Sequence, residues 1–259
     1  MRKIISWFIL IIILIVVAVF VYGLSRKTIC KNLIINIDTV NGKNYFIDEN
    51  DIKRILSETG NDVIGKPLYK INLNQIEKTI NNDPSVDKAE VYSKLDGTIK
   101  IKVRQRVPIL RIMNKRNESY YIDEKGGLMP VSEKYSARVL VANGYISQPY
   151  SSYKVLFNNK GDSIVNKTLI SDLFLLAKFI RNSEFWNSQI DQIYVNENTE
   201  IELVPKTGEH EIILGDIEDM KDKFNKLMVF YLKGLNYIGW DIYKTINLKY
   251  KNQVVCSKN

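Results

Sequence analysis

The stretch Val86–Val103, VDKAEVYSKLDGTIKIKV, determines how the first folded part of this chain is organised. Its second half alternates apolar side chains with charged ones, which is typical of a strand with one buried and one solvated face. The Asp96-Gly97 pair separates the two halves, and this dipeptide favours a type I′ turn because both central residues need positive φ. The stretch therefore predicts an antiparallel β-hairpin whose charged face lies in water.

The residues before this hairpin predict one strand and two helices. A short apolar run, Leu33–Ile37, has the composition of a strand. Asp48 and Asn72 then each precede a run with apolar residues at helical spacing, as N-cap residues do. The order strand, helix, helix, strand, strand predicts a small sheet with both helices on one face.

From Pro108 onward the sequence is richer in strands, and it predicts a second, mixed domain with an α+β fold. Two helices are expected, at about 168–182 and 216–235, with Asp216 as the N-cap of the second. The last strand is expected to run from Tyr243 to Val255, because apolar and polar residues alternate there. The other expected strands are Ile109–Met113, Tyr120–Asp123, Arg138–Ala142, Gln189–Val195, Thr199–Val204 and Glu211–Leu214.

The segment Ile4–Leu24 contains no charged residue. As a helix it is long enough to cover the ~30 Å hydrocarbon core of a bilayer. It predicts a single transmembrane helix after a cytoplasmic tail of residues 1–3, since Arg2 and Lys3 favour a cytoplasmic N-terminus. The alternative, a cleaved secretory signal, would have a shorter apolar core and a small-residue cleavage site.

Catalytic, metal-binding and cofactor-binding patterns are not found in the sequence. His210 is the single histidine, and we interpret it as structural because no second ligand or base accompanies it. The net charge of +8 is spread along the chain without a run of basic residues, which argues against a nucleic-acid partner. Two cysteines, Cys30 and Cys256, are too few for a disulfide scaffold, and whether they pair stays open.

These observations favour a binding protein over an enzyme. An exposed sheet edge offers unpaired N–H and C=O groups to an extended partner segment, so partners can bind by strand addition. The C-terminal strand is the natural candidate for such an edge, with a covered or central strand as the open alternative.

At this point the chain resembles the bacterial division proteins FtsQ and DivIB. The apolar helix leads into residues 31–106, which look like a POTRA domain. Residues 107–255 look like the family's β domain. The segments that carry the resemblance to the POTRA domain are NDPSVDKAEV at 82–91, DGTIKIKV at 96–103 and RQRVPI at 104–109, with Gln105 where an acid is usual. In the β domain they are YYID at 120–123 with Gly126-Gly127, and INLKYKNQVV at 246–255, which is similar to an Asp-Leu-Arg-Tyr terminal strand.

The resemblance implies a non-catalytic divisome scaffold in the cytoplasmic (inner) membrane, single-pass, with its bulk in the periplasm and enriched at the division site. FtsB-like and FtsL-like proteins are the implied partners, with control of septal peptidoglycan synthesis as the outcome; no cofactor or small-molecule substrate is implied. The partner is expected to add a strand at the C-terminal edge, with Tyr250 as the side-chain anchor. The residues expected at this contact are Tyr243, Ile246, Asn247, Leu248, Lys249, Tyr250 and Lys251, and those of a POTRA recruitment surface are Pro84, Val86 and Val91.

Two other classes of function remain as alternatives. One is a POTRA-bearing transport or assembly factor that hands substrates to an outer-membrane barrel, against which the apolar segment Ile4–Leu24 argues. The other is a membrane-tethered cell-wall enzyme. A buried acid, cysteine or serine in a cleft near His210 would favour the enzyme.

Overall fold

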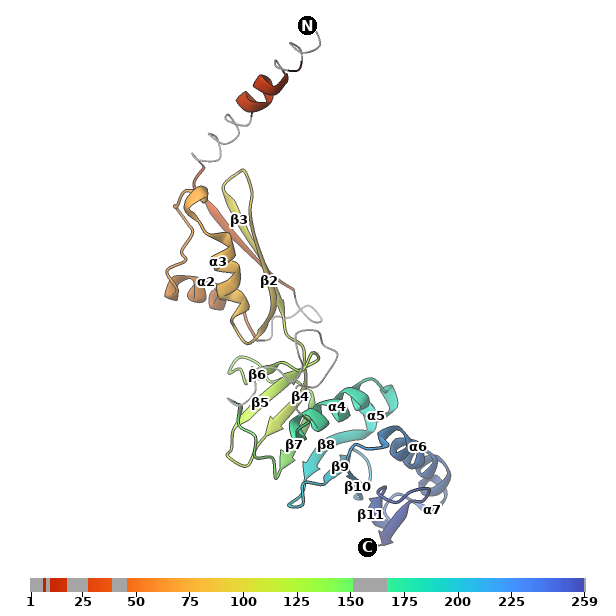
Figure 1. Cartoon of the computed structure of the whole chain (residues 1–259). Coiled ribbons are helices and arrows are strands. Elements are labelled where there is room, and N and C mark those ends of the chain that lie inside the picture. The colour runs from red at the N-terminus through yellow and green to blue at the C-terminus, as the bar shows by residue number, and fades with distance from the viewer. Residues whose placement is uncertain (1–6, 8–9, 18–27, 39–45, 151–166, 259) are drawn as a thin grey trace. The chain divides into compact units, whose positions relative to one another are not determined.

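The computed structural model describes residues 7, 10–17, 28–38, 46–150 and 167–258. It divides the chain into two compact units, Met1–Arg106 and Val107–Asn259 (Figure 1). Each unit has its own cluster of buried apolar side chains, and both combine helices with a β-sheet. The chain is therefore an α+β protein with two separate cores.

The N-terminal apolar segment is described only in part. Residues 10–17 are helical, and the remainder of Ile4–Leu24, apart from Trp7, lies outside the described residues. Among the residues that the structure describes, no helix has both the length and the apolar character that a membrane crossing requires. The transmembrane helix at 4–24 therefore stays a prediction.

The first unit has the expected order of strand, helix, helix, strand, strand. The three strands lie in the order β1-β3-β2, with β1 parallel and β2 antiparallel to the central β3. Helices α2 and α3 lie on the same face of this sheet (Figure 1). The elements are β1 (Asn32–Asp38), α2 (Glu49–Glu58), the short 3₁₀ helix η1 (Leu68–Lys70), α3 (Leu73–Asn81), β2 (Val86–Ser93) and β3 (Thr98–Gln105).

The helix starts in the first unit are set locally. Asp48 caps α2 in a capping box with Asp51, each side chain accepting from the other's backbone N–H. Asn72 caps α3 by accepting from the Gln75 N–H. Both helices then bury an apolar stripe against β3, whose Ile99, Ile101 and Val103 are almost fully buried as the alternation predicted.

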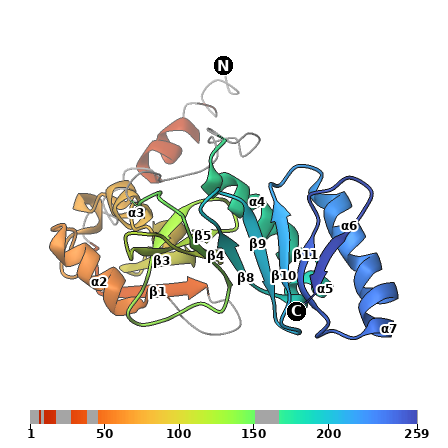
Figure 2. The same ribbon diagram turned by 90° about the horizontal axis from the view of Figure 1, so that it is seen from below.

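The second unit is built on a nine-stranded mixed sheet with the order β12-β11-β10-β9-β8-β7-β4-β5-β6. Figure 2 shows β8, β9, β10 and β11 side by side, with α6 beside β11. The strands are β4 (Pro108–Met113), β5 (Ser119–Asp123), β6 (Leu128–Pro130), β7 (Leu140–Gly144), β8 (Ile190–Val195), β9 (Ile201–Pro205), β10 (Glu211–Gly215), β11 (Tyr243–Asn247) and β12 (Val255–Lys258).

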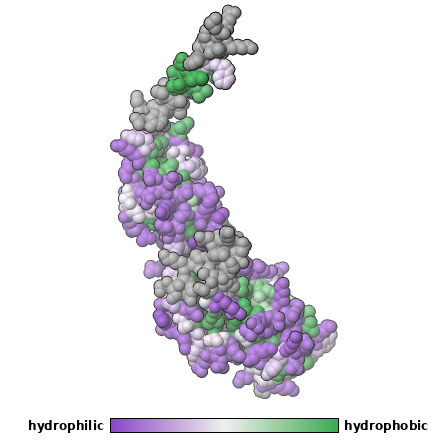
Figure 3. All heavy atoms as spheres, viewed as in Figure 1, coloured by the Kyte–Doolittle hydropathy of each residue, from purple (hydrophilic) through white to green (hydrophobic). Residues whose placement is uncertain are grey.

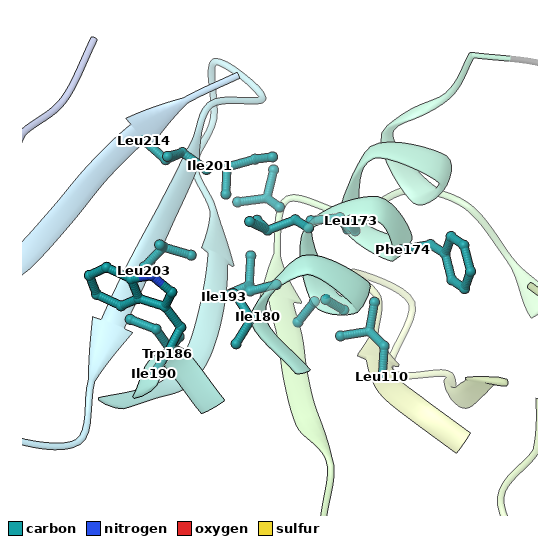
Figure 4. Packing of buried hydrophobic residues seen from close by; sticks show 14 of the residues in the cluster. Leu110, Leu173, Phe174, Ile180, Trp186, Ile190, Ile193, Ile201, Leu203 and Leu214 are labelled. Carbon is teal, nitrogen blue, oxygen red and sulfur yellow. The ribbon is translucent and has the colours of Figure 1, made fainter. Parts of the chain in front are cut away.

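The helices of the second unit supply the other half of its core. They are α4 (Leu169–Arg181), α5 (Glu184–Gln189), α6 (Met220–Phe230), the π-helical turn η3 (Tyr231–Leu235) and α7 (Asn236–Ile238). Figure 4 shows Leu173 and Ile180 of α4 among Ile193, Ile201 and Leu203 of the sheet, with Trp186 of α5 beside Ile190. Burying each of these side chains completely contributes roughly 1.5–3 kcal/mol.

Two expectations about the C-terminal part are wrong. The predicted strand 243–255 is two strands, because the chain leaves the sheet after Asn247 and returns antiparallel as β12, with Asn252 in the left-handed region at φ 59°. Asp216 is not the N-cap of the last long helix. That helix begins at Met220, while the Asp216 carboxylate instead accepts from Lys223 at 2.7 Å and from the Glu218 N–H at 3.0 Å.

Candidate functional site: the C-terminal sheet edge

Three strands form the C-terminal end of the large sheet. β10 and β11 are parallel and are joined through α6, η3 and α7. β12 then pairs antiparallel with β11, and the Thr245 and Ser257 hydroxyls hydrogen-bond across this pair at 2.6 Å. β12 is last in the strand order, so within the described residues no strand lies on its other side. An edge of this kind exposes backbone N–H and C=O groups that an extended peptide can pair with.

The turn between β11 and β12 is fixed by contacts from both sides. The Leu248 N–H donates to the Ile213 carbonyl at 2.9 Å, which extends the pairing with β10 by one residue. Asn247 Oδ1 accepts from the Lys249 N–H at 3.0 Å. From α6, Lys226 Nζ donates to the Leu248 carbonyl at 3.0 Å and to the Tyr250 carbonyl at 2.6 Å. The backbone around Tyr250 is therefore held in one position before any partner binds.

An ion pair ties this turn to the neighbouring loop. Lys249 Nζ lies 2.6 Å from Glu200 Oε1, and this hydrogen bond lowers the pKa of the Glu200 carboxyl and raises that of the Lys249 ammonium. Both side chains are about one third exposed, so water and salt screen the pair and it contributes only about 0.2–1 kcal/mol. Its effect is to orient the turn more than to stabilise the fold.

A shallow groove of about 350 Å³ lies between α6 and the turn. Tyr250, whose side chain is 47% exposed, is among its lining residues. The lining carries the ammonium groups of Lys226, Lys249 and Lys251 as well as the carboxylates of Asp219 and Asp222. Lys244 and Lys258 are also exposed on β11 and β12, so the edge as a whole is basic. Because Lys226 and Lys249 already bond within the protein, the positive charge that a ligand meets here comes mainly from Lys244, Lys251 and Lys258, beside the partly exposed Tyr250 ring.

The expected contact residues are spread over two different environments. Ile246 and Leu248 are 0% exposed and belong to the core, so their side chains cannot meet a partner. Asn247 and Tyr243 are half-buried, and the Tyr243 ring packs on Phe230 with centroids 5.8 Å apart. Lys249, Tyr250 and Lys251 are exposed together on the turn.

Sequence reasoning missed β12, which is the edge itself. Val255 is 42% exposed on this strand, while Cys256 faces the core. The available signal was Lys251-Asn252-Gln253, three polar residues before the β-branched Val254 and Val255, with asparagine as a residue that tolerates the left-handed conformation.

The POTRA residues chosen from the sequence do not form one exposed surface. Val86 is 1% exposed and Val91 is partly buried against the core of the first unit, while Pro84 is exposed. Val86 is buried because it begins the strand that packs under α3. The use of this region for recruitment stays a prediction, and of the three only Pro84 offers its side chain freely.

His210, the one histidine, is a structural residue. Its side chain is 1% exposed, and Nε2 lies 2.9 Å from the Tyr231 hydroxyl, with Trp240 as a further aromatic neighbour. Burial lowers the pKa of the imidazole, so the neutral form is favoured. A substrate in solution does not reach this ring.

Among the described residues, neither a metal site nor a disulfide bond holds the C-terminal edge together. Among the residues that the structure describes, no group of three His, Cys, Asp or Glu side chains is placed to hold a metal ion. Cys30 is buried in the first unit and Cys256 lies on β12, and both are free thiols. Burial raises the pKa of each thiol, which keeps them protonated and weakly reactive near neutral pH.

The fold defines the class of this protein as a POTRA-like unit followed by a mixed-sheet unit that ends in an open edge. Comparison with known families agrees: residues 28–104 match a POTRA-like domain. Residues 107–257, more than half of the chain, match the family described as FtsQ/DivIB, C-terminal related. The chain belongs to this FtsQ/DivIB C-terminal related family.

Two curated proteins are similar to this chain. One is the cell division protein DivIB of Clostridium tetani (strain Massachusetts / E88), 27% identical over 169 residues, which are 64% of this chain and 59% of the relative. The other is the cell division protein FtsQ of Rickettsia prowazekii (strain Madrid E), 26% identical over 125 residues, which are 48% of this chain and 45% of the relative. The matched part thus spans less than two thirds of each relative's length.

Proposed function

We propose that this protein is a non-catalytic cell division scaffold that binds FtsB-like and FtsL-like single-pass proteins and thereby helps control septal peptidoglycan synthesis. The observation that carries the proposal is the C-terminal edge, where β12 pairs with β11 on one side and, within the described residues, has no strand on the other, beside a fixed, partly exposed Tyr250. Family membership and the names of the two relatives support the division role.

The binding step is strand addition to β12. Backbone hydrogen bonds set the register of the partner strand, and Tyr250 supplies the side-chain anchor, because buried aromatic residues dominate interface energies. The exposed lysines on the edge favour a partner segment with acidic side chains and speed its encounter. FtsB-like proteins fill the role of the added strand, with FtsL-like proteins recruited through them.

The proposed location is the cytoplasmic membrane, with the N-terminus in the cytoplasm and both folded units on the outer side. The uncharged segment Ile4–Leu24 and the basic Arg2 and Lys3 before it support this topology. A scaffold in this position meets single-pass partners in the same membrane, where binding is favoured because both proteins are confined to one surface.

The test is recovery of partners with the full-length chain from dividing cells of the natural host. Wild type is expected to recover two small single-pass division proteins, identified by mass spectrometry. Tyr250→Ala is expected to weaken this recovery by about thirty-fold in affinity, the equivalent of a hot-spot loss of ~2 kcal/mol.

Two further variants make the result specific. Tyr237→Ala is the matched control, because Tyr237 is 86% exposed on α7 of the same unit and lies outside the edge. Truncation after Asn252 removes β12 and is expected to abolish recovery, with circular dichroism confirming that the remaining sheet is folded. Partners that bind Tyr250→Ala and the truncated chain as well as wild type would move the site elsewhere, and absence of division proteins from every sample would contradict the function.

A further inference from the structure

Three loops of the first unit, at residues 28–31, 64–70 and 94–97, contact one another at one end of its sheet. The hairpin turn Lys94–Gly97 contacts residues 28–31, with the Lys31 N–H donating to the Gly97 carbonyl at 2.9 Å. Residues 64–70 contact the same segment: Ile29 bridges to Pro67, and the Leu68 N–H donates to the Thr28 carbonyl at 3.0 Å. These contacts fix the three loops together as one rigid end of the unit.

This end exposes large apolar side chains, one or two from each loop. Leu95 is 86% exposed at the hairpin tip, Tyr69 57%, Ile64 56% and Ile29 45%. We call these four residues the loop-end patch. Figure 3 shows hydrophobic atoms at this end of the first unit beside strongly hydrophilic ones. Exposed loops of soluble proteins usually carry polar side chains. A cluster of exposed apolar side chains on three neighbouring loops therefore indicates a surface that contacts another molecule or a membrane.

Lysines surround the patch. Lys31, Lys66, Lys70 and Lys94 are all exposed on the same three loops, and Lys70 Nζ lies 5.8 Å from the centre of the Tyr69 ring. Asp62 and Asp96 are the acidic residues there, and the Asp96 carboxylate is turned back onto its own hairpin, where it accepts from the Thr98 N–H at 2.9 Å. The charge available to a ligand at this end is therefore positive.

The position of the patch in the chain indicates what covers it. The uncharged segment ends at Leu24, and Thr28 is the first described residue that contacts the sheet-bearing part of the first unit. Four residue steps span at most about 14 Å even when fully extended. A headgroup layer is roughly 6 Å thick on each side of the hydrocarbon core. If Leu24 lies at the end of the hydrocarbon core, then Thr28 lies within about 14 Å of that end. The patch, which begins at the next residue, Ile29, therefore lies at or just beyond the headgroup layer.

We propose that the loop-end patch lies against the outer surface of an anionic phospholipid membrane, so that the first unit is docked on the lipid rather than swinging freely on its anchor. This rests on the proposed membrane anchor. Leu95, Ile64 and Ile29 enter the headgroup boundary, and Tyr69 takes the interfacial position that amphipathic rings favour. The four lysines contact lipid phosphates, with their apolar stems lying along the patch. Docking then fixes the height and orientation at which the first unit is presented to other proteins.

The experiment separates the patch from the anchor by using residues 28–259, which lack the apolar segment. This fragment keeps both cores, since every buried core residue lies at or after Cys30. Co-sedimentation is measured with vesicles of phosphatidylcholine alone and of phosphatidylcholine mixed with phosphatidylglycerol. The fragment is expected to bind the anionic vesicles, to bind neutral ones at least about tenfold more weakly, and to be released by salt.

Matched variants locate the binding surface. Leu95→Asp is expected to reduce binding to anionic vesicles at least about tenfold, while Tyr237→Asp, a substitution at a second residue that is 86% exposed, is expected to leave binding unchanged. Replacing Lys31, Lys66, Lys70 and Lys94 by glutamine should abolish binding. Replacing the exposed Lys221, Lys233, Lys244 and Lys258 of the second unit should not.

Several results would overturn the proposal. These are a wild-type fragment that ignores anionic vesicles, equal binding to neutral vesicles, or equal loss in the patch and control variants. Membrane fractionation of the full-length chain tests the anchor independently. An anchored chain whose fragment does not bind lipid refutes the patch and leaves the proposed function in place.

Discussion

His210 shows how a single buried side chain can make the second unit sensitive to pH. Its Nε2 bonds to the Tyr231 hydroxyl, and Nδ1 is buried beside Gly208. Burial lowers the pKa of the imidazole, and this effect outweighs the opposite pull of the Trp240 carbonyl and the Asp241 charge. Gly208 has φ +84° there, and a Cβ at this position would lie 2.7 Å from His210 Nδ1. The ring thus packs tightly against the backbone at Gly208.

The folded protein therefore binds a proton at His210 less readily than the unfolded chain does. The contribution of the neutral His210 ring to the free energy of unfolding is fully present above the ordinary histidine pKa of ~6.5, and it is lost as the pH falls below that value. We expect the free energy of unfolding of the second unit to decrease between about pH 7.5 and about pH 5.5. Urea titrations monitored by tryptophan fluorescence measure it, since Trp186 and Trp240 both lie in this unit.

His210→Gln is the matching variant, because the amide can still pair with the Tyr231 hydroxyl but does not titrate. Its stability should change less over the same pH range, although it is lower at neutral pH. Asp172, whose pKa burial raises, responds in the opposite direction and is present in both proteins, so the comparison cancels it. An equal decrease in both proteins would show that other groups cause the pH dependence.

Gln105 shows how one buried polar side chain holds a loop against the sheet of the first unit. It is 5% exposed, and its Oε1 accepts from the Phe46 N–H at 3.0 Å and the Ile47 N–H at 3.2 Å. A carboxylate would accept the same two bonds, but the amide does so without burying a charge. Gln105 therefore ties residues 46 and 47 to the end of β3 without placing a charge in the core.

At the scale of elements, the short turn between β11 and β12 determines what the edge can present. Lys226 reaches this turn from α6 and bonds to the carbonyls on both sides of Lys249. The helix thus holds a loop more than twenty residues further along the chain. Because the contacts are to backbone, they position Tyr250 without depending on which side chains surround it.

Lys226→Met should release this turn while keeping the apolar stem of the side chain. We expect a loss of about 1 kcal/mol in the free energy of unfolding, since two charge-assisted hydrogen bonds are lost but the site is partly solvated. Partner binding should weaken by about five-fold or more, because Tyr250 must then be ordered on binding. Isothermal titration with a synthetic partner peptide measures this.

Lys221→Met on the same helix is the control, because Lys221 is exposed and belongs to no ion pair that the structure shows. It should leave both stability and binding unchanged. Normal partner affinity in Lys226→Met would mean that the turn needs no support from α6.

At the scale of the whole molecule, two separate cores predict two separate unfolding transitions. Ile101 is 1% exposed in the first core and Leu203 is 0% exposed in the second. Truncating either to alanine should cost about 2–5 kcal/mol in its own unit. The other unit should keep its stability, because none of its core residues is altered.

Hydrogen exchange with mass spectrometry follows both units in one sample. Ile101→Ala should speed exchange in peptides from β1 to β3 only, and Leu203→Ala in peptides from β4 to β12 only. Faster exchange throughout the chain in either variant would show that the units fold as one cooperative body.

The sequence alone predicted the hairpin, helix caps and buried strand faces that depend on residues close together in the chain. The expected type I′ turn at Asp96-Gly97 is wrong, because Gly97 has positive φ (89°) but Asp96 does not, and the Gly97 N–H donates to the Lys94 carbonyl, which makes Leu95 and Asp96 the central residues of the turn. The hairpin itself, the Asp48 cap and the burial of Ile99, Ile101 and Val103 are as expected. These features depend on a few residues that are adjacent along the chain, so local patterns are sufficient to find them. The POTRA-like unit and the family resemblance follow from such features and are confirmed.

Only the tertiary structure determined the edge. Alternation over 243–255 is equally compatible with one long strand or with two strands and a turn, because both bury every second residue near Ile246. The choice depends on the Asn252 conformation, on Lys226 from another helix and on Glu200 from another loop. Asp216 is likewise drawn from its expected cap to Lys223. Contacts between residues that are distant in the sequence leave no periodic pattern in it. The polar residues at 251–253 allow a turn, but only the folded molecule shows that the chain turns there and ends the sheet with β12.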